Sequence, residues 1–135
     1  MHVSPLRVVI ADDDDQLAGL ITAALRDDGR FTVVGRASTG DEAVELAGEQ
    51  HPDLVVMDIA MPSCDGIEAT RLIHELDAER HIVIYTASNN FEHIARAEAA
   101  GAVGFLHKSA VSTAELPNAL YVLHTNHARE LPEPY

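Results

Sequence analysis

The chain of 135 residues has one cysteine, few basic residues and no long apolar run. Cys64 has no partner for an intrachain disulfide, which is typical of a protein in a reducing compartment. No stretch reaches the about 20 apolar residues of a membrane helix, and the apolar segment at 8–11 is too short for the core of a signal peptide. We expect a cytoplasmic protein that does not bind a membrane and that folds as one domain around a single core.

Basic residues are scarce, since nine Lys and Arg stand against 22 Asp and Glu, which gives a formal net charge of −13. Such a chain repels phosphate backbones, so we do not expect it to bind DNA or RNA directly. The acidic residues are densest at Asp12, Asp13, Asp14 and Asp15. This patch suits a divalent cation, while Asp14 or Asp15 is expected to cap the helix that follows.

Five continuous apolar runs alternate with longer helical patterns along the chain. The runs are 6–11, 31–36, 53–58, 81–86 and 103–107. Continuous runs, unlike alternating ones, indicate strands buried on both faces, as in a parallel sheet covered by helices. Five such strand–helix units predict an α/β fold with a doubly wound parallel sheet. We expect this domain to occupy 1–128 and 129–135 to be a tail or the stub of a linker.

The helical patterns predict which side chains face the core. Leu20 belongs to the apolar stripe of the first helix, and Phe91 to that of the fourth. Ser112 and Glu115 have the spacing of a capping box for the fifth helix. Pro117 would then interrupt that helix at a cost of about 3 kcal/mol, so we expect the helix to begin after Ser112.

Polar residues follow four of the apolar runs. Asp12 and Asp13 follow the first, Asp58 ends the third, Thr86 ends the fourth and Lys108 follows the fifth. Ligands of open α/β sheets bind beyond the carboxyl ends of the strands, so these groups should meet at one edge. Two carboxylates about 5 Å apart repel by roughly 3 kcal/mol at an effective dielectric near 20. Mg²⁺ would relieve this repulsion, because it binds a few carboxylates together with phosphate oxygens.

Four segments carry a resemblance to a known family: RVVIADD, PDLVVMDIAMPSCDGIEA, IVIYTAS and AGAVGFLHKSA, which together span 7–110. They resemble the receiver domain of bacterial two-component response regulators. LHKSA and STGDEAVELA are most similar to receivers of the NarL/FixJ group, whose output domain is a helix-turn-helix (LuxR-type) module. The resemblance implies a flavodoxin-like fold, with five helices around a parallel sheet of strand order 2-1-3-4-5.

The resemblance also implies the chemistry of the site. Asp58 would accept a phosphoryl group from a phosphohistidine on a sensor histidine kinase. Asp12, Asp13 and Asp58 would hold Mg²⁺ with the backbone carbonyl of Ala60, and Lys108 would contact the phosphoryl group. Such a domain phosphorylates and dephosphorylates itself but turns over no external metabolite, so it is not an enzyme in the ordinary sense.

Thr86 and Phe105 would form the switch. The hydroxyl of Thr86 would move toward the phosphoryl group, and the ring of Phe105 would turn into the space that this movement vacates. The face formed by the fourth helix, fifth strand and fifth helix would then contact an output domain or a second copy of the chain. A homodimer through the first and fifth helices is the alternative, and DNA would be bound only through an output domain outside this sequence.

Several residues depart from the family pattern or leave other functions open. Ser109 stands where many members have proline, commonly after a cis bond, and a serine disfavours such a bond. Ala60 stands where phosphatases with an aspartyl-phosphate need a second acid, which argues against that class. A pseudo-receiver that binds a partner without phosphorylation remains the main alternative. We expect Cys64 to be structural, and His124 and His127 to be solvated surface residues.

Overall fold

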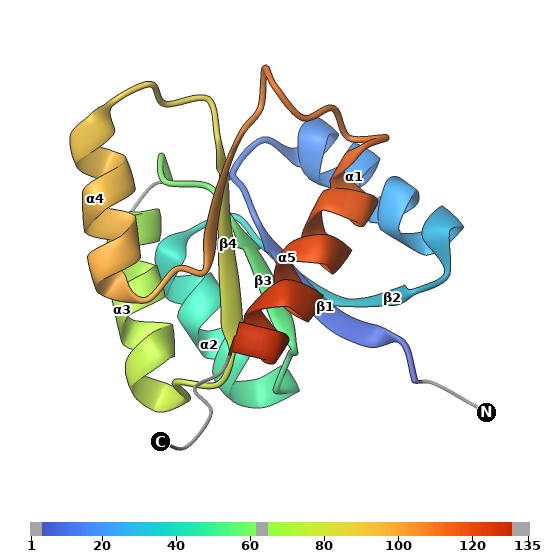
Figure 1. Ribbon diagram of the computed structural model, residues 1–135, viewed down its shortest axis with the longest axis horizontal. Coiled ribbons are helices and arrows are strands. Elements are labelled where there is room, and N and C mark those ends of the chain that lie inside the picture. The colour runs from blue at the N-terminus through green and yellow to red at the C-terminus, as the bar shows by residue number, and fades with distance from the viewer. Residues whose placement is uncertain (1–3, 62–64, 131–135) are drawn as a thin grey trace.

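Five parallel strands form one sheet in the order β2-β1-β3-β4-β5 (Figure 1), which confirms the predicted α/β architecture. The computed structural model describes residues 4–61 and 65–130, the last four as backbone only. The strands are β1 (Leu6–Ala11), β2 (Phe31–Ala37), β3 (Leu54–Met57), β4 (His81–Thr86) and β5 (Gly104–His107). The helices are α1 (Asp15–Asp28), α2 (Gly40–Gln50), α3 (Gly66–Leu76), α4 (Phe91–Ala100) and α5 (Leu116–Glu130).

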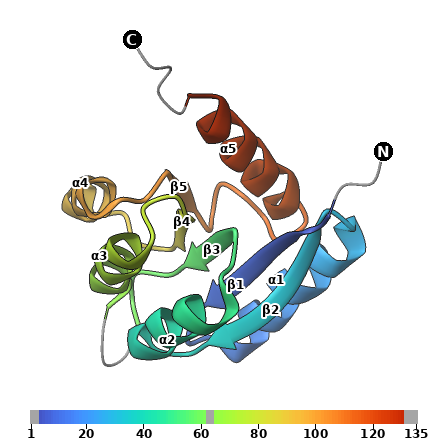
Figure 2. The same ribbon diagram turned by 90° about the horizontal axis from the view of Figure 1, so that it is seen from below.

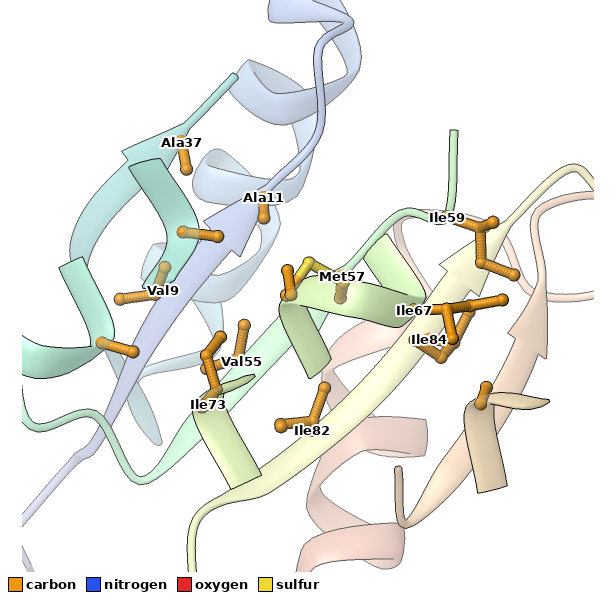
Figure 3. Packing of buried hydrophobic residues seen from close by; sticks show 14 residues of the cluster. Val9, Ala11, Ala37, Val55, Met57, Ile59, Ile67, Ile73, Ile82 and Ile84 are labelled. Atoms are coloured by element: carbon orange, nitrogen blue, oxygen red, sulfur yellow. The ribbon is translucent and has the colours of Figure 1, made fainter. Parts of the chain in front are cut away.

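The helices cover both faces of the sheet, so the core is divided into two clusters (Figures 1 and 2). On one face, side chains of α1 and α5 pack against Val8, Ile10 and Val56. On the other, α2, α3 and α4 pack against Val9 and Val55, as Figure 3 shows. Because neighbouring residues of one strand enter opposite clusters, both faces of the strands are apolar, as the continuous runs predict.

The predicted helix boundaries are confirmed at α1 and α5. The carboxylate of Asp14 accepts a hydrogen bond from the Leu17 N–H and caps α1, which ends at Gly29 in the left-handed conformation (φ 83°). Ser112 and Glu115 form the reciprocal hydrogen bonds of a capping box, but α5 itself begins at Leu116. Pro117 therefore lies in the first turn of the helix, where its missing N–H costs little.

Two side chains expected in the core lie at the surface instead. Leu20 is 54% exposed and Phe91 is 84% exposed. Ala97 is the buried residue of α4, so the helix faces the sheet through a different stripe from the one predicted. The periodicity of α4 is ambiguous because alanine occupies both its buried and its exposed positions, and alanine burial gives little contrast between faces.

Some predictions fall outside the described residues. They concern Cys64, the side chain of His127, and 131–135 of the expected tail. Within 4–61 and 65–130, no peptide bond is cis, including the one before Ser109. None of the helices in these ranges is long and apolar enough to cross a membrane.

Candidate functional site

The predicted site residues meet at the carboxyl edge of the sheet. Asp12 follows β1, Asp58 follows β3, Thr86 ends β4 and Lys108 follows β5. Backbone hydrogen bonds extend the sheet into this edge. The Asp58 N–H donates to the carbonyl of Ala11 (2.9 Å), and the Lys108 N–H donates to that of Thr86 (2.8 Å). The functional side chains thus start from backbone that is held by neighbouring strands.

Three carboxylates form a cluster that could bind a metal ion. One oxygen each of Asp12, Asp13 and Asp58 lies within 4.8 Å of the others. Asp12 and Asp58 are buried while Asp13 is exposed. The Oδ1 atom of Asp58 is buried and has no hydrogen-bond partner among the described residues. An all-oxygen donor set with an unsatisfied buried acceptor fits Mg²⁺.

Lys108 connects two of these carboxylates. Its Nζ atom lies 2.8 Å from Asp12 Oδ2 and 3.1 Å from Asp58 Oδ2. Burial alone would lower the pKa of the Lys108 ammonium, but the hydrogen bond to Asp12 and the charge of Asp58 outweigh burial and raise it. The lysine is therefore held as a cation between the two acids.

The pKa of the Asp12 carboxyl group is also raised, but here the raised pKa disfavours the charged form. Burial raises its pKa, and the charge of Asp58 acts in the same direction. The hydrogen bonds that it accepts from Lys108 and from the backbone of Asp14 lower the pKa, but burial outweighs them. A buried, crowded carboxylate is one that a divalent cation would stabilise.

A glycine fixes the loop that follows Asp58. The Gly66 N–H donates to the carbonyl of Ile59 (2.8 Å), so the start of α3 lies against this loop. A Cβ atom at Gly66 would stand 1.9 Å from the carbonyl oxygen of Asp58. No other residue can occupy this position without displacing the backbone of Asp58. Ala60 lies in the same loop and is exposed, and its carbonyl remains a predicted ligand.

The predicted switch residues lie on adjacent strands, β4 and β5, but they are not paired, because Thr86 pairs with His107 and Phe105 with Ile84. Thr86 is buried, and its hydroxyl oxygen accepts a hydrogen bond from the Ser88 N–H (3.3 Å). Phe105 pairs with Ile84 of β4 and lies half-buried against the core. It lines a cavity of about 300 Å³ together with Ala97 of α4 and neighbouring residues of β5. There is thus open space beside the ring.

Sequence reasoning missed the histidines around this site. His93 of α4 lies with its Nδ1 atom 2.7 Å from the hydroxyl of Ser88. His107 of β5 is hydrogen-bonded to both loops that flank the site. The proximity of His107 to Lys108 in the sequence was the one available signal. At the opposite end of the sheet, His124 was expected to be solvated, but its Nδ1 atom lies 2.7 Å from that of His81.

Comparison with known proteins shows the family to which the chain belongs. Residues 8–121 match the model of the family described as "Response regulator receiver domain". The chemotaxis protein CheY of Halobacterium salinarum is 41% identical over 102 residues, which cover 76% of this chain and 83% of the relative. The transcriptional regulatory protein PdtaR of Mycobacterium tuberculosis is 42% identical over 106 residues. That alignment covers 77% of this chain but only 50% of PdtaR.

Solved structures show the same fold. The signal receiver domain of the response regulator NarL from Mycobacterium tuberculosis superimposes with a TM-score of 0.85 at 27% sequence identity. The match covers 91% of this chain and 98% of that domain. The sequence relatives and this neighbour agree with the family match over most of the chain. The chain therefore belongs to the receiver domain family of two-component response regulators.

Proposed function

We propose that this chain is a phosphorylation-dependent signalling switch that accepts a phosphoryl group on Asp58 from a sensor histidine kinase. One observation supports this most directly. Asp58 is buried, its Oδ2 is bound by Lys108, and its Oδ1 is without a hydrogen-bond partner among the described residues. Leaving a buried acceptor unsatisfied costs about 1–3 kcal/mol, which is expected where that atom is kept for a ligand or a reaction.

Receiver domains bind Mg²⁺ at an acidic pocket. In this chain, Asp12, Asp13, Asp58 and the carbonyl of Ala60 would hold the ion. When bound, Mg²⁺ supplies positive charge against the oxygens of the transferring phosphoryl group. The close approach of the three carboxylate oxygens supports this assignment, because oxygen ligands at such spacing suit a small hard cation.

The reaction would be a direct transfer. An oxygen of the Asp58 carboxylate forms a bond to phosphorus while the phosphorus–nitrogen bond of the donor histidine breaks, and its electron pair stays on the imidazole. Lys108 is positioned to donate a charge-assisted hydrogen bond to a phosphoryl oxygen, since it already lies 3.1 Å from Asp58 Oδ2. Thr86 would supply a hydroxyl donor from the adjacent strand end.

The switch would couple Thr86 to Phe105. The Thr86 hydroxyl is now directed to the backbone of Ser88, and turning it toward a phosphoryl group would free space next to β5. The cavity beside Phe105 gives the ring room to move. Shifting such an equilibrium from 1:99 to 99:1 requires about 5.5 kcal/mol, which a few charge-assisted hydrogen bonds can largely supply.

The partners that we propose are a sensor histidine kinase, an output domain and a second copy of the chain. The receiver would occupy 1–128 in the cytoplasm and connect through 129–135 to an output domain, which alone would bind DNA. The face of α4, β5 and α5 is our proposed site for output contact or for a homodimer, and α1 with α5 is the alternative dimer face. The chain spans only half the length of PdtaR, which is consistent with a receiver joined to a second domain.

The test is to incubate the protein with Mg²⁺ and acetyl phosphate and follow its intact mass. We expect the mass gain of one phosphoryl group, lost in Asp58→Asn. No gain, or a gain that persists in Asp58→Asn, would contradict the proposal. Partner binding of equal strength for wild type and Asp58→Ala would favour a pseudo-receiver. Sustained hydrolysis of a phosphate ester that depends on Asp58 would instead favour a phosphatase.

A further inference from the structure

The imidazole of His107 joins the two loops that carry the reactive groups of β4 and β5. His107 pairs with Thr86 in the sheet, and these two strand ends lie at the same edge (Figure 1). The Nε2 atom of His107 lies 3.1 Å from the carbonyl oxygen of Ala87, directly after Thr86. Its Nδ1 atom lies 3.1 Å from the backbone N and 2.6 Å from the hydroxyl of Ser109, directly after Lys108.

These contacts determine where the proton of the imidazole lies. A backbone N–H can only donate, so Nδ1 must accept from Ser109 and carries no proton. The carbonyl of Ala87 can only accept, so Nε2 must carry the proton and donate it. His107 is therefore held as the neutral Nε2–H tautomer, with a hydrogen-bond partner on each side of the ring.

We propose that His107 is a positioning residue for phosphoryl transfer, which sets the turn around Lys108 against the loop that follows Thr86. This inference rests on the proposed phosphoacceptor function of Asp58. His107 and Ser109 act as a pair, because Ser109 has the backbone N–H and the hydroxyl that bind Nδ1. A proline after Lys108 would lack that N–H and could not make the contact.

The backbone around Lys108 shows why such a support matters. Lys108 follows the last residue of β5, and its own N–H is bound by Thr86 (2.8 Å). The next residues turn away, with Ala110 and Val111 donating to the carbonyl of His107 (3.0 and 3.1 Å). The imidazole adds a link between this turn and Ala87. Because a phosphoryl group on Asp58 must be met by Lys108 and Thr86 at once, holding their loops in register lowers the cost of reaching the reactive geometry.

Three variants separate positioning from folding. His107→Leu removes both contacts. His107→Asn keeps an acceptor near Nδ1 for Ser109 but does not reach Ala87. Ser109→Ala, at an exposed residue, removes only the hydroxyl. His51→Asn is the matched control, because His51 caps α2 in the left-handed conformation (φ 48°), which asparagine tolerates.

The measurement is the rate of Asp58 phosphorylation by acetyl phosphate at saturating Mg²⁺, with thermal unfolding recorded for each variant. We expect His107→Leu to lower the maximal rate at least about tenfold, since small displacements of reacting groups are costly. The acetyl phosphate concentration for half-maximal rate should not change. Ser109→Ala should lower the rate about threefold, the equivalent of one neutral hydrogen bond. His107→Asn should recover part of the loss, and His51→Asn should match wild type.

The outcomes distinguish this inference from the function on which it rests. Normal rates in both His107→Leu and Ser109→Ala, with wild type phosphorylated on Asp58, would overturn the positioning role alone. So would a nitrogen NMR spectrum of the folded protein that shows His107 as the Nδ1–H tautomer, since this measurement needs no phosphorylation. A wild-type protein that takes no phosphoryl group would overturn the proposed function and this inference with it.

Discussion

Replacing Lys108 by methionine should destabilise the protein and make its stability more dependent on Mg²⁺. Lys108 Nζ lies 2.8 and 3.1 Å from the carboxylates of Asp12 and Asp58. At an effective dielectric near 20, these attractions are worth about 6 and about 5 kcal/mol before desolvation. Desolvation offsets most of this, and removing one partner of a buried ion pair typically costs about 3–5 kcal/mol. Because the Lys108 side chain is 20% exposed, we expect a loss near the lower value, about 3 kcal/mol.

The assay is urea unfolding of wild type and Lys108→Met, each with and without Mg²⁺. In the variant, Asp12 and Asp58 repel each other with no cation between them, and no ammonium group competes with the ion. Mg²⁺ should therefore stabilise the variant more than wild type. The stabilisation should increase with the ratio of the Mg²⁺ concentration to the dissociation constant of the Mg²⁺ complex.

A control separates the site from simple loss of charge. Arg96→Met removes a cation from an exposed position of α4 and should change the free energy of unfolding by less than about 0.5 kcal/mol. The reasoning is refuted if Lys108→Met is as mild as this control, or if Mg²⁺ stabilises wild type and Lys108→Met equally.

Two further predictions concern Gly66 and Ser112, and a third concerns the pH dependence of the Lys108 ion pairs. Gly66→Ala places a Cβ 1.9 Å from the Asp58 carbonyl oxygen and should cost at least about 2 kcal/mol in urea unfolding; unchanged stability would show that the loop adapts freely. Ser112→Ala removes a capping hydroxyl and should cost about 1 kcal/mol, seen as a melting temperature roughly 4 °C lower; no decrease would mean that the box does not stabilise α5. The raised pKa of Lys108 means that its stabilisation is complete below its ordinary pKa of 10.5 and is lost as pH rises through the higher folded value. The free energy of unfolding should therefore be measured against pH for wild type and for Lys108→Met. Burial also raises the pKa of Tyr85, which affects both proteins at alkaline pH, so the difference between the two curves is due to the lysine. Identical curves would contradict the prediction.

The sequence was most informative where burial and chemistry change abruptly. Asp58 and Thr86 could be placed at strand ends because an uninterrupted apolar run stops there, and the sheet then brings such ends together. The late start of α5 was predictable for a similar reason, since Pro117 is compatible with the first turn of a helix and not with a later one. The positions of these residues within their strands and helix follow from local sequence patterns and do not depend on contacts with distant segments.

Other features depend on contacts between distant segments. Phe91 looked like a core residue because it is apolar and falls on a helical period, but only packing decides which face of an alanine-rich helix is buried. The links of His107 to Ala87 and of His124 to His81 join different elements. A histidine at a surface and a histidine between two elements have the same sequence signature, so the position of His107 beside Lys108 could draw attention to it but could not predict either contact.

Lys108 is the only lysine in the chain, so the acidic pocket contains the only side-chain amine. Amine-specific reagents, which attack the uncharged form, should modify Lys108 slowly while Asp12 and Asp58 keep its ammonium group protonated. Any ligand that draws these carboxylates away should speed the labelling. Labelling of the peptide that contains Lys108 would then report on the occupancy of the pocket, and acetylation of Lys108 would remove the positive charge between Asp12 and Asp58.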